Sequence, residues 1–317
     1  MKIAVLFPGQ GSQFLGMGQE FIKDDPASAD LMAMAEAVCG LKLGALIADG
    51  PMEELTRATN LQPAITITNL ICWQRLHNEL GGQVAVSCMA GHSLGEYSAL
   101  CASGVIGVED TIRLVGERGA LMEREGNSNP GGMRAVLGLD SQTLDAIIEG
   151  YKGEGVVTAA NHNTPEQIVI SGSLPGLDGV TRLAEEKGAR VIPLNVSVAN
   201  HSPLVAAAIP DFKNFMRRIT FNPPKIPIYF NVSAKVDSDP ETIKDMMARQ
   251  IASKVRWCEI IESMLADGVD TFIEVGPKAV LKGMIKKIAP KGTKITALQF
   301  DSPSSLASCL EALRKEQ

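Results

Sequence analysis

The chain has 317 residues, of which 45% are hydrophobic and 21% charged, and its formal net charge is −6. A chain of this length can bury a core without a metal or disulfide staple, and its composition excludes an intrinsically disordered protein. The isoelectric point of about 5.4 and the lack of a long basic stripe argue against a nucleic-acid partner, and no stretch approaches the ~20 apolar residues of a membrane span.

The start of the chain and its cysteines indicate a cellular compartment. The apolar run Ile3–Phe7 is too short to be the core of a secretory signal peptide. Six cysteines stand far apart and form neither a CxxC pair nor a zinc-ligand spacing, namely Cys39, Cys72, Cys88, Cys101, Cys258 and Cys309. We therefore expect a cytoplasmic protein without a metal site.

Short apolar runs alternate with amphipathic stretches, which predicts an α/β fold. The runs are nearly continuous in apolar or β-favouring residues, as is typical of strands covered on both faces. The predicted strands are Ile3–Phe7, Val84–Ala90, Ile226–Asn231, Thr271–Val275 and Ile295–Phe300. The predicted helices are Glu53–Ala58, Ala64–Leu80, Tyr97–Ala102, Asp110–Arg124, Pro203–Arg218, Pro240–Ile251, Glu259–Ala266 and Ala279–Ile288.

A run of helix-breaking residues, Glu125–Gly132, predicts a linker to a second unit. The segments that follow alternate in the order βαββαβ, which is typical of a ferredoxin-like domain. They are a strand at Met133–Leu139, a helix at Ser141–Gly150 begun by a serine cap, strands at Val156–Asn161 and Gln167–Ser171, a helix at Leu177–Lys187 and a strand at Ala189–Val196. We predict a small domain at residues 127–198, inserted into a large α/β domain of residues 1–126 and 199–317.

The segment Gly91–Gly95 has the sequence GHSLG, which matches G-x-S-x-G. The match is weak by itself in a chain with 30 glycines. Its context is stronger, because an apolar run precedes it and a helix start rich in small residues follows. Strand, sharp turn and helix are what a nucleophile elbow requires, so Ser93 is the candidate nucleophile. The alternative is a structural turn with an ordinary serine.

A serine nucleophile needs a base, and the chain has four histidines. His77 is predicted to be a solvated helix residue, and the turn at Ser93 is predicted to aim His92 away from it. His162 lies in the small domain and stays a candidate. His201 lies in a loop at the predicted domain junction, where a cleft would open, and we therefore choose it as the base.

The order of these residues differs from that of an ordinary α/β-hydrolase, which runs Ser, Asp or Glu, then a late His. No histidine follows His201.

A second glycine-rich element, Phe7–Gln13, follows the first strand, but Phe14 stands where a dinucleotide fingerprint needs a third glycine. The loop could instead supply one N–H group of an oxyanion hole, with Leu94 supplying the other.

Taken together, these motifs resemble the malonyl-CoA:acyl-carrier-protein transacylases. The matching segments span nearly the whole chain in order: Phe7–Gln13, Gln62–Ala64, Gly91–Leu100 (GHSLGEYSAL), Arg118-Gly119 with Met122, His201, and Glu274–Pro277. The resemblance implies an α/β-hydrolase-like large domain with a ferredoxin-like insert. Without the resemblance, the position of Arg118 in a predicted helix would predict a solvated side chain, like those of Arg113 and Arg124.

The resemblance also implies a role for each matching residue. Ser93 would be the nucleophile, His201 the general base, and Arg118 the group that holds the free carboxylate of a malonyl unit. The backbone amides of Gln10 and Leu94 would form the oxyanion hole. The backbone carbonyl of Gln250 would orient His201 in place of an aspartate, and Asn161 would lie near the pocket, which argues against catalysis by His162. Asn200 stands at a position that varies with acyl selectivity.

The implied activity is transfer of malonyl from malonyl-CoA to the phosphopantetheine thiol of an acidic acyl carrier protein, for fatty acid synthesis. We expect ping-pong kinetics, a monomer, and no metal or redox cofactor. The expected docking patch includes Lys286 and Lys287 within the set Lys278, Lys282, Lys286, Lys287, Lys291 and Lys294, which could equally be a solvated helix end. Three alternatives are a thioesterase-like serine hydrolase, a non-catalytic carrier-binding subunit, and a related acyltransferase of polyketide synthesis or malonate decarboxylation.

Overall fold

A computed structural model describes residues 1–81, 85–196 and 198–315 of the chain. Four parallel strands form the larger sheet in the order β2 (Val86–Gly91), β1 (Ile3–Phe7), β7 (Thr271–Val275) and β8 (Thr296–Phe300). The predicted strands β1 and β7 are confirmed to the residue, and β2 and β8 to within two residues at either end. The first residue of the predicted strand Val84–Ala90 lies outside the described residues.

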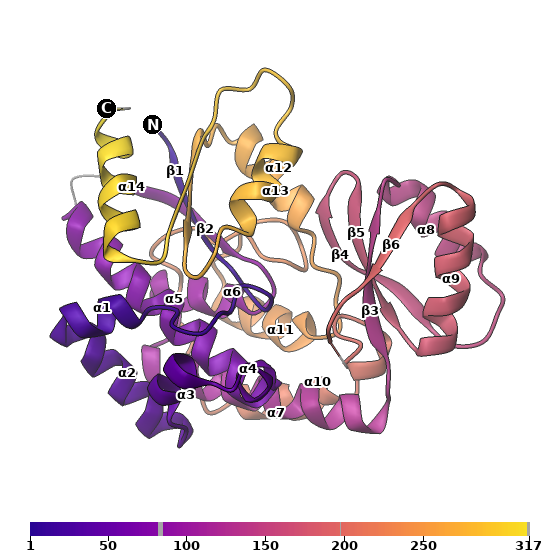
Figure 1. Cartoon of the computed structure of the whole chain (residues 1–317), viewed down its shortest axis with the longest axis horizontal. Helices are drawn as coiled ribbons and strands as arrows, with labels where there is room; N and C mark the ends of the chain where they lie inside the picture. Colours follow the sequence, from indigo (N-terminus) through magenta and orange to yellow (C-terminus); the bar gives the residue numbers. More distant parts are fainter. Residues whose placement is uncertain (82–84, 197, 316–317) are drawn as a thin grey trace.

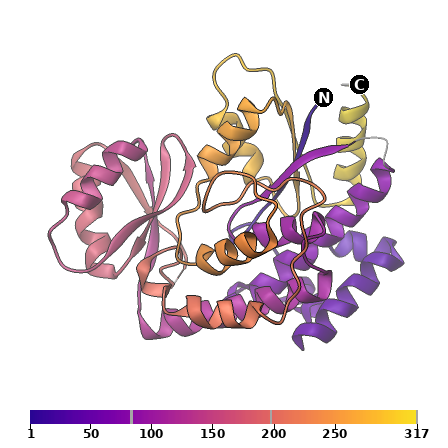
Figure 2. The same cartoon turned by 180° about the vertical axis from the view of Figure 1, so that it is seen from behind.

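Helices cover both faces of this sheet (Figures 1 and 2). Strand side chains alternate between faces, so Ile3, Val5 and Phe7 join one buried cluster while Ala4 and Leu6 join another. The helices of this part of the chain are α1 (Gln19–Asp24), α2 (Pro26–Cys39), α3 (Leu43–Asp49), α4 (Met52–Thr56), α5 (Ala58–Leu80), α6 (Gly95–Ala102), α7 (Val108–Ser128), η1 (Pro203–Val205), α10 (Ala208–Met216), α11 (Pro240–Gln250), α12 (Trp257–Ala266), α13 (Leu281–Ile288) and α14 (Pro303–Lys315).

The small sheet is antiparallel, in the order β4 (Val157–Thr164), β5 (Gln167–Gly172), β3 (Gly132–Leu137) and β6 (Arg190–Pro193). Helices α8 (Ser141–Gly150) and α9 (Leu174–Glu186) cover one of its faces (Figure 1). This confirms the βαββαβ order and the predicted fold class. The cap of α8 differs from the prediction, because the Asp140 side chain accepts the Thr143 N–H and Ser141 is the first helical residue.

The segment Ile226–Asn231 is not a strand, contrary to the prediction. Among the described residues it forms only the single bridges of Ile228 to Met89 and of Tyr229 to Val236. Pro227 interrupts the segment and has no N–H to donate, so a continuous ladder cannot form. The backbone still docks beside β2, where the Met89 N–H donates to the Pro227 carbonyl at 2.8 Å.

Helix α7 continues to Ser128, through the first half of the predicted linker Glu125–Gly132. Only 129–131 separate it from β3. Tertiary packing explains the difference, because Gly126 lies against Val198, where a Cβ atom would come within 2.5 Å of that side chain. Helices α1, α2, α3 and α14 were not predicted. We propose the division into residues 1–126 with 199–317 and residues 127–198, with α7 crossing its first boundary.

Candidate active site

Ser93 lies in a sharp turn between β2 and α6, and its φ of 49° is in the left-handed region. Such a φ is uncommon for a residue with a side chain. The flanking glycines permit it, since a Cβ atom on Gly91 would lie 2.0 Å from the Gly95 carbonyl carbon, and one on Gly95 would lie 2.1 Å from the Phe7 carbonyl oxygen. The turn therefore has the backbone shape of a nucleophile elbow.

Ser93 and His201 are in direct contact, although 108 positions separate them in the sequence. The Oγ atom of Ser93 lies 2.7 Å from Nε2 of His201. The other ring nitrogen, Nδ1, lies 3.0 Å from the backbone carbonyl oxygens of both Gln250 and Ser253. Carbonyl oxygens only accept, so Nδ1 holds the hydrogen and the Nε2 lone pair faces the Ser93 hydroxyl.

Burial and, to a smaller extent, the charge of Arg118 lower the pKa of His201 from the ordinary 6.5 to about 3. The side chain is 4% exposed. At neutral pH the imidazole is therefore uncharged, which is the form that can take a proton from Ser93.

Arg118 extends from α7 into this site and is 1% exposed. Its Nη1 donates to Gln62 Oε1 at 2.9 Å, and its Nη2 donates to Gln250 Oε1 at 3.1 Å and to Ser93 Oγ at 3.3 Å. Its Nε has no partner, and no carboxylate lies within ion-pair distance of the guanidinium, among the residues described. A buried cation without an anionic partner is suited to bind an anionic group of a substrate.

A cavity of about 160 Å³ lies beside the dyad and is lined from both domains. Ser93, His201 and Arg118 share its wall with Asn161 of β4, which is 5% exposed. Gln10 and Leu94 also line it, and neither backbone N–H group has an acceptor in the described part of the chain. Two N–H groups free beside a nucleophile can stabilise an oxyanion.

A larger groove of about 770 Å³ adjoins the cavity. Gln10, Met122, Val196 and Asn200 line both. The Oδ1 atom of Asn200 is buried there without a partner among the described residues. The groove runs between α4, the end of α7 and the start of α9, so it connects the dyad to the outside along the domain junction.

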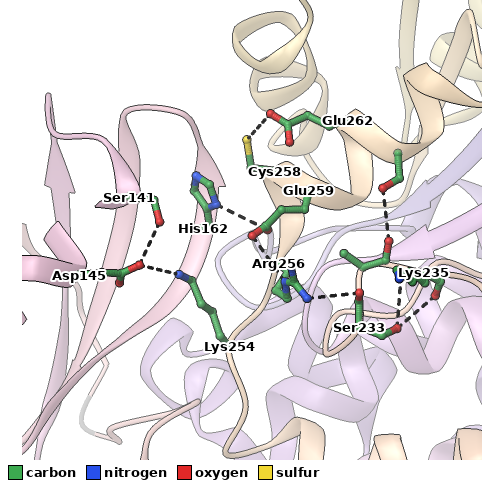
Figure 3. Close-up of polar contacts among 12 residues, drawn as sticks. Ser141, Asp145, His162, Ser233, Lys235, Lys254, Arg256, Cys258, Glu259 and Glu262 are labelled. Atoms are coloured by element: carbon green, nitrogen blue, oxygen red, sulfur yellow. Dashed lines mark hydrogen bonds and ion pairs between the residues drawn. The ribbon is translucent and has the colours of Figure 1, made fainter. Parts of the chain in front are cut away.

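The other histidines are engaged elsewhere. His92 Nε2 lies 2.8 Å from Asn163 Oδ1, and its ring packs edge-on against Trp257. His162 points at Glu259 of α12, with Nδ1 and Oε2 3.5 Å apart (Figure 3). His77 is exposed on α5, as predicted. Among the described histidines, only His201 contacts Ser93.

Figure 3 also shows the contact between the domains next to this site. Lys254 reaches Asp145 of α8 at 3.7 Å, and the Val255 N–H donates to the Ala160 carbonyl of β4 at 2.8 Å. The segment 250–255 therefore contacts the small domain, and through the carbonyls of Gln250 and Ser253 it also contacts the ring of His201.

Several polar residues of the site were missed by the sequence analysis, chiefly the side chain of Gln250, Glu96 and Asn231. Asn231 accepts the Ser93 N–H at 2.7 Å, and Glu96 accepts from both Asn231 and Gln250. Glu96 lies inside the GHSLGEYSAL motif, which was the one available signal. Asn231 ends a segment predicted as a strand and gave no signal of its own.

The predicted lysine patch lies on α13 and in the loops before and after it. Lys278, Lys286, Lys287, Lys291 and Lys294 are exposed, while Lys282 is half-buried. Within the described ranges, no group of three or more His, Cys, Asp or Glu side chains could hold a metal ion.

No single helix of the described chain has the length and apolar composition to cross a bilayer, although the bent pair α2–α3 meets that test when the two are taken together.

Comparisons with known proteins agree on one family. A model of the acyl transferase domain matches residues 5–298. The malonyl CoA-acyl carrier protein transacylase of Bacillus subtilis (strain 168) is 38% identical, over 99% of this chain and 98% of that protein. The protein of the same name from Escherichia coli (strain K12) is 37% identical, over 98% of this chain and 99% of its own length.

Solved structures give the same result. An acyl carrier protein S-malonyltransferase from Vibrio cholerae is similar with a TM-score of 0.91 and 37% identity, over 98% of this chain and 100% of that one. A malonyl-transacylase in complex with a type II PKS acyl-carrier protein is similar with a TM-score of 0.93 and 35% identity, over 98% and 100% of the two chains.

Proposed function

The chain belongs to the malonyl CoA-acyl carrier protein transacylase family of acyl transferases, and on that premise we propose that it transfers the malonyl group of malonyl-CoA to the phosphopantetheine thiol of an acyl carrier protein for fatty acid synthesis. The observation that best supports this activity is the buried Arg118, which has no anionic partner among the described residues and whose Nη2 lies 3.3 Å from the Oγ of a serine that contacts a neutral histidine.

The first step forms a malonyl-O-serine intermediate. His201 Nε2 takes the Ser93 proton as Oγ attacks the thioester carbonyl, and the N–H groups of Gln10 and Leu94 stabilise the oxyanion. The C–S bond then breaks, and coenzyme A leaves as a thiol after His201 returns the proton. Because a thioester is already activated, general-base assistance of ~10²–10⁴-fold suffices without a third acidic residue.

The second step regenerates the enzyme. The phosphopantetheine thiol gives its proton to His201 and attacks the serine ester, and the Ser93 Oγ leaves with that proton. Both dyad residues come from one chain, which fits the expected monomer. Neither step changes an oxidation state, so the scheme uses no redox cofactor.

Arg118 selects the acyl group. A guanidinium can hold a carboxylate by two parallel charge-assisted hydrogen bonds, which suits the distal carboxylate of malonyl. An acetyl group would leave the buried charge unpaired, at a cost of ~2–5 kcal/mol, or roughly 30- to 5,000-fold in rate.

The groove of about 770 Å³ receives the arm that both substrates share. Coenzyme A and the carrier protein present the same pantetheine unit, which is long, narrow and amide-rich. The amide side chains of Asn127, Asn195 and Asn200 line this groove and can pair with such groups. The carrier protein itself docks at the lysine patch around Lys286 and Lys287.

Intact-protein mass spectrometry tests this function. Wild-type protein mixed with malonyl-CoA alone should gain one malonyl mass, and holo acyl carrier protein should then discharge it onto its thiol. Ser93→Ala should gain no mass. Free malonate without an adduct would support a hydrolase instead, and no reaction at all would rule out the malonyl substrate.

A further inference from the structure

One side chain from outside the elbow fixes both ends of the turn at Ser93. Asn231 is fully buried. Its Oδ1 accepts the Ser93 N–H at 2.7 Å, and its Nδ2 donates to the Gly91 carbonyl at 2.7 Å. Its own backbone N–H donates to Glu96 Oε1 at 2.6 Å. The left-handed backbone of Ser93 is therefore held by a contact that leads to Glu96.

The side chain of Gln250 connects the same glutamate to Arg118. Its Nε2 donates to the Ser93 carbonyl at 2.7 Å and to Glu96 Oε2 at 2.8 Å, while its Oε1 accepts from Arg118 Nη2. This orientation of the amide is unambiguous, because an arginine only donates and a backbone carbonyl only accepts. Gln250 is fully buried, so the bridge is shielded from water.

Glu96 lies at the centre of this network and is 1% exposed. Both carboxylate oxygens accept a hydrogen bond, which favours the ionised form. Burial raises the pKa of Glu96 to about 8, although those two bonds and the charge of Arg118 oppose the shift. The side chain of Gln250 separates the buried carboxyl group of Glu96 from Arg118.

We propose that Glu96 is a positioning residue, which acts through Gln250 to aim Arg118 and through Asn231 to hold Ser93. The Gln250 amide between Glu96 and Arg118 matters for binding of the substrate carboxylate. A carboxylate in direct contact with Arg118 would occupy the guanidinium that the substrate carboxylate needs, whereas a carboxyl group one side chain away orients Arg118 and leaves the guanidinium accessible. This inference rests on the proposed function, because it assumes a carboxylate on the acyl group.

The test is Glu96→Gln, which keeps the shape and replaces one of the two accepting oxygens by an NH₂ group. The new NH₂ group must face either the Asn231 N–H or Gln250 Nε2, and both are donors. The Asn231 N–H belongs to the buried backbone and the Gln250 amide to a side chain, so we expect Gln250 to be the one that moves and Arg118 to lose its aim. We expect kcat/KM for malonyl-CoA to fall about tenfold or more, and the ratio of malonyl-CoA to acetyl-CoA kcat/KM to fall with it. An equal fall for both esters, or no fall, overturns the proposal.

Asn231→Ala provides the complementary result. It releases Ser93 without touching Arg118, so the rates with both esters should fall by the same factor and their ratio should stay unchanged. If the malonyl-to-acetyl ratio falls as far as in Glu96→Gln, the Asn231–Ser93 contact and the Gln250–Arg118 contact do not act separately, and the proposal fails.

Glu274→Gln is the matched control, since Glu274 is another fully buried glutamate and accepts three backbone N–H groups at the start of α13. It should lower Tm and leave the malonyl-to-acetyl ratio unchanged. If Glu96→Gln does not fold, Gln250→Met removes the same amide bridge at similar length and should lower the ratio. Wild-type malonylation is measured alongside, so failure of the proposed function shows as a missing wild-type adduct.

Discussion

Arg118 Nη2 donates a hydrogen bond to Ser93 Oγ at 3.3 Å, so a buried positive charge lies against the side chain that His201 contacts from the other side. The same charge helps to keep His201 neutral and favours negative charge on the Ser93 oxygen. One residue can therefore orient a carboxylate, prepare the base and stabilise the nucleophile.

Arg118→Lys should distinguish carboxylate binding by the planar guanidinium from the effect of its positive charge. Lysine keeps a cation but loses the planar fork, so kcat/KM for malonyl-CoA should fall by roughly tenfold or more, while the slow reaction with acetyl-CoA should change much less. The control is Arg113→Lys on the exposed face of the same helix, which should leave both unchanged. Equal losses for the two esters would show that Arg118 does not hold the carboxylate.

The pH dependence of acylation should reflect the lowered pKa of His201, about 3 in place of 6.5. We expect kcat/KM for malonyl-CoA to stay level as the pH falls from 8 to about 5, because the base is still unprotonated. Rapid-quench measurement of the malonyl adduct across this range checks it. A fall in rate centred near pH 6.5 would show that His201 titrates normally.

The same lowered pKa affects stability. Between pH 6.5 and about 3 the unfolded chain binds a proton at His201 that the folded protein does not. The free energy of unfolding is therefore undiminished by His201 above pH 6.5 and falls as the pH falls through this range. The denaturation midpoint should therefore decline less on acidification in His201→Gln than in wild type. Parallel declines would contradict the expectation.

Gly95→Ala should disrupt the elbow. The added Cβ atom would lie 2.1 Å from the Phe7 carbonyl oxygen, so the turn and β1 must separate. We expect a drop in Tm of several degrees or more and loss of the malonyl adduct. Gly116→Ala is the control, because that helical glycine has open space around it and alanine favours the helix. An active Gly95→Ala variant of unchanged Tm would contradict the geometry.

Lys286→Glu combined with Lys287→Glu tests the docking patch. If an acidic carrier protein binds there, the KM for holo carrier protein should rise severalfold, and the KM for malonyl-CoA should not change. Raised ionic strength should weaken the binding of carrier protein to the wild-type enzyme and so raise the same KM. Lys23→Glu with Lys42→Glu makes the same charge change at two other exposed lysines. Equal effects of the two pairs would point to net charge and not to a docking site.

Much of the fold followed from local patterns. The buried strands β1 and β7, the βαββαβ order of the small domain and the strand–turn–helix context of Ser93 are encoded within short segments. Ile226–Asn231 was mispredicted because its apolar run outweighed Pro227. Helix α7 was predicted too short because packing of Gly126 on Val198 overrides the local preference of its last turn.

The site was only partly predictable. Ser93 could be found from its motif and His201 from its loop, but Arg118 resembles any other helix arginine, and only the resemblance to a family selected it. Glu96, Asn231 and Gln250 could not be connected from the sequence, since Asn231 lies 138 positions from Ser93 and Gln250 lies 154 from Glu96.

The sequence by itself determined the α/β class, the inserted small domain, the elbow and the family, because periodicity, glycine placement and motif order are local or collinear properties. Only the tertiary structure decided that Arg118 is buried with no anionic partner in the described part of the chain, that the Gln250 amide separates it from Glu96, and that the dyad faces a cavity between two domains. These depend on distances between segments far apart in the chain, and such distances are set when the whole core packs and excludes water.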